Sequence, residues 1–275
     1  MRGITQILVV INSEQTQQLA LNRAVQFCRV SGAALHILAP DPKFTPTSLA
    51  KLERLSAPLL EEGLEVYSHV LWQKNITETI LHTQQITHCN LIIKDISLSK
   101  TWDLFKTPTD WDLLRHSRIP VLLVQTEGAW EQVRMLAAID ANPNDCQHAV
   151  MNHAILDYTN ELAMAFSADI YLTSAYPTTH LAARSYEDSI TEHDAYKRVC
   201  MEHVREFHLN ENNLFIEAGP AETLIPNLIK QSKIRLLVLG THARKGLSAL
   251  AIGNTAEQLL TKVNNTDILV IPPQC

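Results

Sequence analysis

The stretch LLVLGTHARKGLSALAIGNTAEQLL, residues 236–260, carries the pattern that decides the fold. It opens with five apolar or small residues, which is typical of a buried strand in a parallel sheet. A loop with glycines at 240, 246 and 253 follows, three of the eight glycines in the chain. Asn254 and Glu257 then have the spacing of a helix N-cap and its third helical residue. The stretch therefore predicts a strand, a glycine-rich loop and a helix.

A corresponding stretch, LIIKDISLSKTWDLFKTPTDWDLL, occupies residues 91–114 of the first half. Counting back from the last apolar run of each half aligns Lys94 with Gly240 and Thr107 with Gly253. Pro108 and Asp110 suit the first turn of a helix. The backbone N–H that proline lacks has no partner within the first turn, and an acidic side chain there interacts favourably with the helix dipole. The second half has 18 more residues before this stretch, which we place mainly in 178–194.

The two halves repeat the same series of apolar runs, separated by amphipathic stretches. Alternating strands and helices predict parallel sheets, because each connection must cross a face of the sheet to reach the next strand. We therefore predict an α/β fold with two tandem, doubly wound, five-stranded parallel sheets of Rossmann-like type, in domains 1–128 and 129–275. The paired strands are predicted at 6–11 and 134–139, 34–40 and 169–177, 64–72 and 213–219, 90–94 and 236–240, and 120–125 and 267–273.

Composition narrows the class of protein. The 275 residues are 46% hydrophobic and 19% charged, as in an ordinary globular protein. The net charge is -6 and no stripe of lysine or arginine is present, which argues against nucleic acid as a partner. No run of 18 apolar residues and no cleavable leader are visible, so we expect a cytoplasmic protein without a membrane span. The five cysteines form no C-x-x-C pair and are expected to be reduced.

Open parallel sheets bind ligands beyond the carboxyl ends of their strands, often at a helix N-terminus that attracts anions. The loops after the first and fourth strands of the second half are therefore the candidate ligand site. Glycines there would let a phosphate approach the backbone, although turns and a helix cap explain them equally well. The candidate ligand-binding residues are Asp140, Gly240, Thr241, His242, Gly246, Gly253, Asn254 and Thr255.

The segment GTHARKGLSALAIGNTAEQLL, followed by the terminal DILVIPP, resembles the C-terminal signature of the universal stress protein family. The ATP-binding branch of that family has glycine, two residues, glycine, nine residues, glycine and then serine or threonine, with aspartate after the first strand. Gly240, Gly253 and Asp140 match this pattern, whereas Ala243 and Asn254 depart from it. The FKTPTDWDLLR stretch of the first half and GNTAEQLL of the second resemble tandem members.

The resemblance implies an adenine-nucleotide α-hydrolase-like fold whose two domains pack as a pseudo-dimer, with homodimerisation left open. It also implies a stress-response protein that binds ATP or another adenine nucleotide in its second domain, with no metal required. The degenerate first half should not bind ATP in this way.

The alternative is a nucleotide-independent scaffold or amphiphile-binding regulatory protein, with protein partners. The tryptophans at 72, 102, 111 and 130 suggest an apolar cleft in the first half, although packing between the domains also explains them. No compact nucleophile motif or P-loop occurs, so we predict a protein that is not an enzyme. Weak ATP hydrolysis, with Asp140 orienting water, stays an open alternative.

Overall fold

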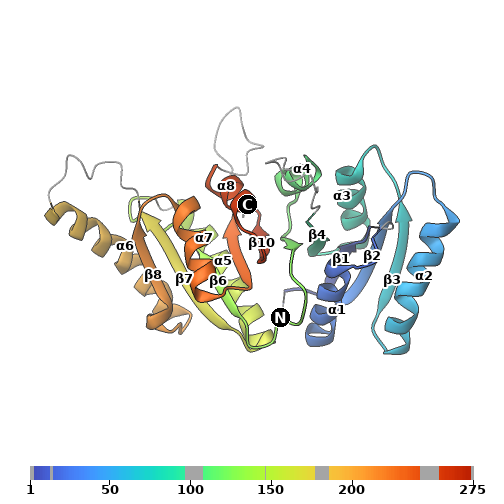
Figure 1. The fold of residues 1–275 in the computed structure, drawn as a ribbon, viewed down its shortest axis with the longest axis horizontal. Coiled ribbons are helices and arrows are strands. Elements are labelled where there is room, and N and C mark those ends of the chain that lie inside the picture. The colour runs from blue at the N-terminus through green and yellow to red at the C-terminus, as the bar shows by residue number, and fades with distance from the viewer. Residues whose placement is uncertain are drawn as a thin grey trace. The chain divides into compact units, whose positions relative to one another are not determined.

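The computed structural model describes residues 3–12, 15–96, 108–145, 147–176, 186–241 and 254–273. The chain divides into two compact units, Met1–Ala129 (unit 1) and Trp130–Cys275 (unit 2). Each unit is built on parallel strands that alternate with helices, as Figure 1 shows. The predicted tandem α/β fold is therefore confirmed.

Unit 1 contains five strands and four helices among its described residues. Its strand order is β3-β2-β1-β4-β5, and all neighbours run parallel. The path along the sheet reverses after β3, so right-handed connections put α1 and α2 on one face and α3 and α4 on the other. The elements are β1 (Gln6–Val10), α1 (Leu19–Ser31), β2 (Ala34–Pro40), α2 (Pro46–Glu61), β3 (Val66–Leu71), α3 (Ile76–Thr87), β4 (Leu91–Asp95), α4 (Pro108–His116) and β5 (Val121–Val124).

Unit 2 repeats this topology, with strand order β8-β7-β6-β9-β10 and parallel neighbours. Its helix α6 has 21 residues where α2 has 16, which accounts for part of the predicted excess. The elements are β6 (Arg134–Ala138), α5 (Gln147–Phe166), β7 (Asp169–Tyr176), α6 (Tyr186–Glu206), a short 3-10 helix (Glu211–Asn213), β8 (Leu214–Ala218), α7 (Ala221–Ser232), β9 (Leu236–Gly240), α8 (Asn254–Lys262) and β10 (Asp267–Ile271).

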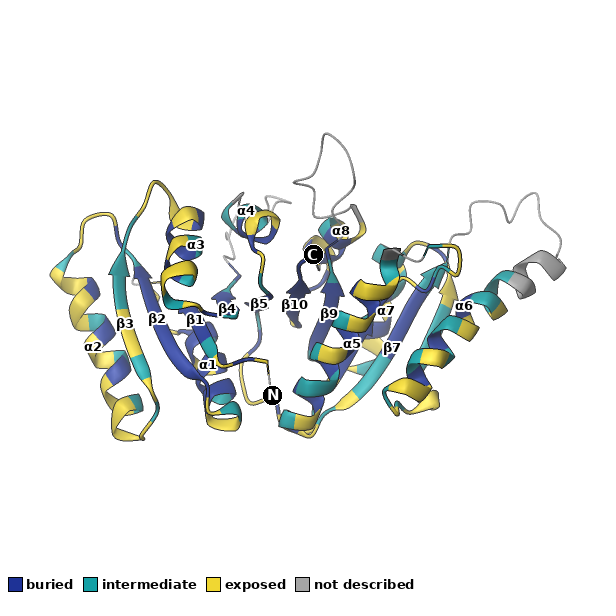
Figure 2. Ribbon diagram, turned by 180° about the vertical axis from the view of Figure 1, so that it is seen from behind, coloured by how far each residue is buried: buried dark blue, intermediate teal, exposed yellow. Residues whose placement is uncertain are grey.

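The core of each unit is the aliphatic centre of its sheet. Strands β2, β4, β5, β9 and β10 are buried along almost their whole length, whereas β3 and β8 at the sheet edges are partly exposed (Figure 2). Continuous apolar strands are expected wherever helices cover both faces of a sheet. The sequence pattern located these strands because that burial leaves no room for polar alternation.

Helix ends in unit 1 follow local sequence signals. Helix α1 ends at Gly32, whose φ of 71° is the left-handed conformation that glycine adopts without strain. Helix α2 begins after Thr45, and the neighbouring Asp41 carboxylate accepts hydrogen bonds from the Thr45 and Ser48 hydroxyls at 2.7 and 2.6 Å. These hydrogen bonds hold the pKa of Asp41 well below its usual range. The loop after β2 is therefore fixed by its own side chains.

A buried histidine, His36, and a half-buried one, His69, form a polar contact within the sheet of unit 1. The His36 Nε2 lies 2.7 Å from the Gln6 side-chain oxygen, which can only accept, so this nitrogen carries the proton. The His36 Nδ1 then accepts from the His69 Nε2 at 3.0 Å, and the Tyr67 ring stacks on His36. Burial lowers the pKa of both imidazoles, and for His36 the neighbouring His69 adds to this. The folded pair is therefore neutral near pH 7.

We expect the free energy of unfolding to fall as the pH is lowered from about 8 to about 5. The unfolded histidines, with a pKa of about 6.5, take up protons more readily than the folded pair. The variant His69→Gln keeps an N–H donor for His36 and should make this decline shallower. Urea unfolding across the pH range tests it, with the exposed His82→Gln as the matched control. A His69→Gln slope equal to that of the wild type would contradict the prediction.

Candidate functional site

The candidate site lies in unit 2, where the loops after β6 and β9 diverge. Strand β6 leads toward β7 on one side and β9 toward β10 on the other, which is the switch point at which open α/β sheets bind ligands. The two strands are neighbours, with Ala138 paired to Leu239. The structure therefore brings Asp140, Gly240 and Thr241 to one edge of the sheet.

The other candidate ligand residues are described only in part. His242, Gly246 and Gly253 lie outside the described residues. Helix α8 starts at Asn254, where the sequence predicted a helix start, and Thr255 in its first turn is exposed. Because α8 connects the carboxyl end of β9 to the amino end of β10, its first turn faces the switch-point edge. The N–H groups of a first turn have no partner within the helix and favour anions.

Asp140 is exposed, but its backbone is held firmly. The buried Asn152 of α5 accepts from the Asp140 N–H at 3.1 Å and donates to the Asp140 carbonyl at 2.7 Å. The next residue, Ala141, donates its N–H to the Ser174 hydroxyl of β7 at 3.1 Å. The Asp140 carboxylate accepts from the Asn142 N–H at 3.1 Å and lies 3.6 Å from the His148 Nδ1. The carboxylate therefore points from a rigid backbone into solvent.

Tyr196 lies near Asp140, and Tyr176 packs against Tyr196. Tyr176 ends β7, and its ring centroid lies 5.6 Å from that of Tyr196, a buried residue of α6. Burial first, and then the charges of Asp140 and Glu192, raise the pKa of Tyr196 to about 12, so its phenol stays protonated. His193 packs edge-on against Tyr176 with centroids 6.1 Å apart. An aromatic surface thus flanks a fixed carboxylate.

Sequence reasoning did not find Asn152, Tyr176 or Tyr196. Asn152 is a polar residue within the apolar pattern of α5, and such a residue signals a buried hydrogen bond. Tyr196 follows the extra segment of the second half, which no motif covers. Their roles depend on how α5 and α6 pack over β6 and β7, and spacing within one loop does not reveal this.

Gly240 and Thr241 are engaged inside the unit. A Cβ built on Gly240 would lie 2.6 Å from the Met151 Cγ and even closer to its Sδ, and Gly240 is absent from the residues with positive φ in the described chain. Its small size is therefore required by Met151 packing and not by backbone conformation. Thr241 is buried, and its hydroxyl donates to the Ile271 carbonyl at 3.3 Å.

Comparison with known proteins identifies the family of the chain. The model of the universal stress protein family matches residues 3–125 and again residues 133–272. The chain belongs to the universal stress protein family. It is 28% identical to universal stress protein E of Photorhabdus laumondii over 99% of this chain and 96% of that protein. It is 29% identical to universal stress protein E of Escherichia coli K12 over 97% of this chain and 93% of that protein.

Solved structures of universal stress proteins share the tandem fold. A putative universal stress protein from Pseudomonas aeruginosa is 33% identical and superimposes with a TM-score of 0.88, over 99% of this chain and 94% of that one. A universal stress protein from Archaeoglobus fulgidus is 12% identical, with a TM-score of 0.63 over 98% of this chain and 96% of that one. The second likeness shows the fold alone.

The corresponding edge of unit 1 corrects the predicted alignment of the two universal stress domains. The Ile96 N–H donates to the Val124 carbonyl, and the Thr241 N–H donates to the Ile271 carbonyl in the same way. Asp95 therefore occupies the position of Gly240, and the prediction that Lys94 does so is wrong by one residue. The predicted alignment used equal separations in the two halves. In the structure Asp95 lies 29 residues before Val124, whereas Gly240 lies 31 residues before Ile271, so the separations differ.

The described residues at this edge of unit 1 are charged at the end of β4, whereas the sequence suggested an apolar cleft in the first half. The Asp95 carboxylate accepts from the Ala20 N–H in the first turn of α1 at 2.5 Å. Lys94 is 8% exposed, and its ammonium lies 2.6 Å from the carboxylate of Asp110, which is 1% exposed. Lys51 donates to the Asn12 carbonyl at 3.1 Å. Carboxylates of the protein itself therefore lie at the first turns of α1 and α4, where a ligand anion would otherwise bind.

The described part of the chain also bears on three other possibilities, namely a metal site, reactive cysteines and a membrane span. No group of three or more His, Cys, Asp or Glu there could hold a metal ion. Cys28 and Cys200 are buried in the core, and burial raises the pKa of both thiols to about 12, which suppresses the reactive thiolate. No described helix combines the length and the apolar character needed to cross a membrane.

Proposed function

We propose that this member of the universal stress protein family is a non-catalytic stress-response protein whose unit 2 binds a nucleotide or a related anionic small molecule. The ligand would lie at the switch point between β6 and β9. The observation that carries the proposal is the exposed Asp140 carboxylate, whose backbone is fixed by Asn152 and which lies near Tyr196, a ring that packs on Tyr176.

The nucleoside part of a nucleotide would lie by Asp140 and Tyr176, and its phosphates by the first turn of α8. A ribose hydroxyl can donate to Asp140, as acidic residues bind ribose in other dinucleotide-binding sheets. The aromatic surface of Tyr176 can pack against the flat base, since stacking is favourable for any base. The phosphates would lie away from the carboxylates, at the first turn of α8, where N–H groups and the helix dipole favour negative charge.

Removing the Asp140 carboxylate should weaken nucleotide binding at least about tenfold. A hydrogen bond to a charged group contributes about 1.5–3 kcal/mol, which corresponds to roughly 10- to 150-fold in affinity. Isothermal titration of the full chain with ATP, ADP and AMP compares the wild type with Asp140→Ala. Native mass spectrometry of the same samples reports the number of nucleotides bound, which we expect to be one.

Two control variants locate the effect. Asp169→Ala removes an exposed carboxylate at the amino end of β7, the opposite edge of the sheet, and should bind as the wild type does. Asn12 lies two residues after β1, as Asp140 lies two residues after β6, so Asn12→Ala changes the equivalent position of unit 1 and should also have no effect. The absence of saturable binding to the wild type would overturn the ligand proposal. Steady ATP hydrolysis that Asp140→Ala abolishes would overturn its non-catalytic part.

A further inference from the structure

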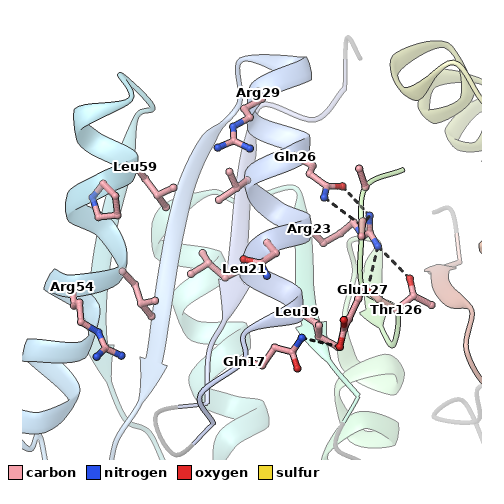
Figure 3. Close-up of a pocket in the computed structure, with 16 residues that line it drawn as sticks. Gln17, Leu19, Leu21, Arg23, Gln26, Arg29, Arg54, Leu59, Thr126 and Glu127 are labelled. Carbon is pink, nitrogen blue, oxygen red and sulfur yellow. Dashed lines mark hydrogen bonds between the residues drawn. The ribbon is translucent and has the colours of Figure 1, made fainter. Parts of the chain in front are cut away.

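A pocket of about 560 Å³ opens in unit 1 between α1, α2 and residues 126–129 (Figure 3). Pockets of ~300–1,000 Å³ are the usual size for small-molecule sites. It runs along the sides of the two helices, whereas the candidate nucleotide site belongs to unit 2. The proposed function therefore leaves it unexplained.

Apolar side chains face each other across part of the pocket. Leu21 and Val25 are one helical turn apart on α1, and Leu55 and Leu59 are one turn apart on α2. Figure 3 shows Leu21 and Leu59 on the facing sides of these helices. Such paired walls, with the sheet behind them, suit an elongated apolar group such as an alkyl chain.

The charged residues of the lining favour an anion. They are three arginines and one glutamate, in a chain whose net charge is -6. Arg29 is held by two bonds to Glu62, at 2.6 and 2.7 Å, and Arg23 donates to the Gly128 carbonyl at 3.0 Å. Arg54 is exposed and makes no hydrogen bond or ion pair with another described residue. Its guanidinium is thus available for a ligand.

The orientation of a bound ligand follows from the two ends of the pocket. Glu127, which accepts from the Gln17 amide at 2.8 Å, belongs to the segment on the far side of α1 from α2. Arg54 stands on α2, one turn before Pro58 of the lining. Repulsion from Glu127 and attraction to Arg54 would both direct a negative head group toward α2. A guanidinium binds a carboxylate through two parallel hydrogen bonds, which an ammonium cannot do.

We propose that this pocket binds a small amphiphilic anion, namely a carboxylate with an alkyl chain. The chain lies between the leucines of α1 and α2, and the carboxylate pairs with Arg54. This site is independent of nucleotide binding in unit 2.

Decanoate is the probe, titrated into the full chain below its micelle-forming concentration by calorimetry, with the thermal midpoint as a second readout. We expect saturable binding of one decanoate per chain, weakened about tenfold or more by Arg54→Gln, because a charge-assisted pair is lost. Leu59→Asp, at a half-buried position, should abolish binding by placing a carboxylate in the wall. Arg118→Gln removes an exposed arginine outside the lining and should bind as the wild type does.

Ligand controls separate specific binding from adsorption. Decyltrimethylammonium has the same chain with a positive head and should not bind, and acetate has the head without the chain and should not bind. Equal affinity of wild type and Arg54→Gln, or equal binding of the cationic amphiphile, would overturn the proposal, as would no saturable decanoate binding. Circular dichroism verifies that each variant is folded. Nucleotide titration of Arg54→Gln should match the wild type, so the two proposals fail separately.

Discussion

Lys94→Ala is expected to lower the free energy of unfolding of unit 1 by about 3–5 kcal/mol, the typical cost of breaking a buried ion pair. Lys94 reaches from the end of β4 to Asp110 in the first turn of α4, with 2.6 Å between the charged atoms. The ammonium also donates to the Asp95 carbonyl at 2.9 Å. Alanine would leave the carboxylate of Asp110 buried without its cation. Urea unfolding followed by circular dichroism measures the loss.

A double variant shows whether the loss of the pair or the single unpaired charge sets this cost. Replacing both residues, as Lys94→Met with Asp110→Leu, removes both buried charges, and such replacements are often neutral or stabilising. We therefore expect the double variant to be more stable than Lys94→Ala. The control is Lys74→Ala, which breaks an exposed pair with Glu78 at 3.7 Å and should cost under about 0.5 kcal/mol. A Lys94→Ala loss as small as that of the control would contradict the prediction.

The same pair shows which parts of the fold the sequence could predict. The strands were found because five apolar runs in each half must be covered on both faces, and burial of that kind leaves a direct trace in the sequence. The role of Asp110 was found only in part. Its place in the first turn of α4 was predicted, but its burial against Lys94 depends on the side chain of another element. The sequence around a polar residue at a strand end does not reveal which side chain of another element it will contact.

The alignment of the two sites shows a different limit. Counting residues between strands paired Val124 with Val270, whereas the hydrogen bonds pair Val124 with Ile271. The second half also has two more residues between the matched positions, and the two errors together leave a net slip of one residue, from Asp95 to Lys94. Asp140 was identified because it directly follows a strand. Asn152 and Tyr196 were missed because helices over 10 residues away in sequence bring them to that strand end. The candidate loop was thus predictable, whereas the residues that support it were not.

Gly240→Ala is expected to destabilise unit 2 by about 1–3 kcal/mol, the usual cost of forcing an extra group into a packed core. The added methyl would lie 2.6 Å from the Met151 Cγ and 3.3 Å from the Ile155 Cδ1. Both neighbours belong to α5, which is anchored to the β6 loop through Asn152, so the helix cannot move away without loss of those hydrogen bonds. Thermal and urea unfolding of the variant measure the effect.

Met151→Ala supplies the test of this explanation. It should itself cost about 2–5 kcal/mol, because it leaves a cavity. In that background Gly240→Ala should cost much less than in the wild type, since only the Ile155 Cδ1 at 3.3 Å then remains close to the methyl, and the two changes should be strongly non-additive. The nucleotide affinity of the double variant shows whether Gly240 also contacts the ligand. We expect the double variant to keep the wild-type affinity, because the Gly240 Cβ would point toward α5. If the double variant folds but no longer binds nucleotide, Gly240 contacts the ligand directly and packing is only part of its role.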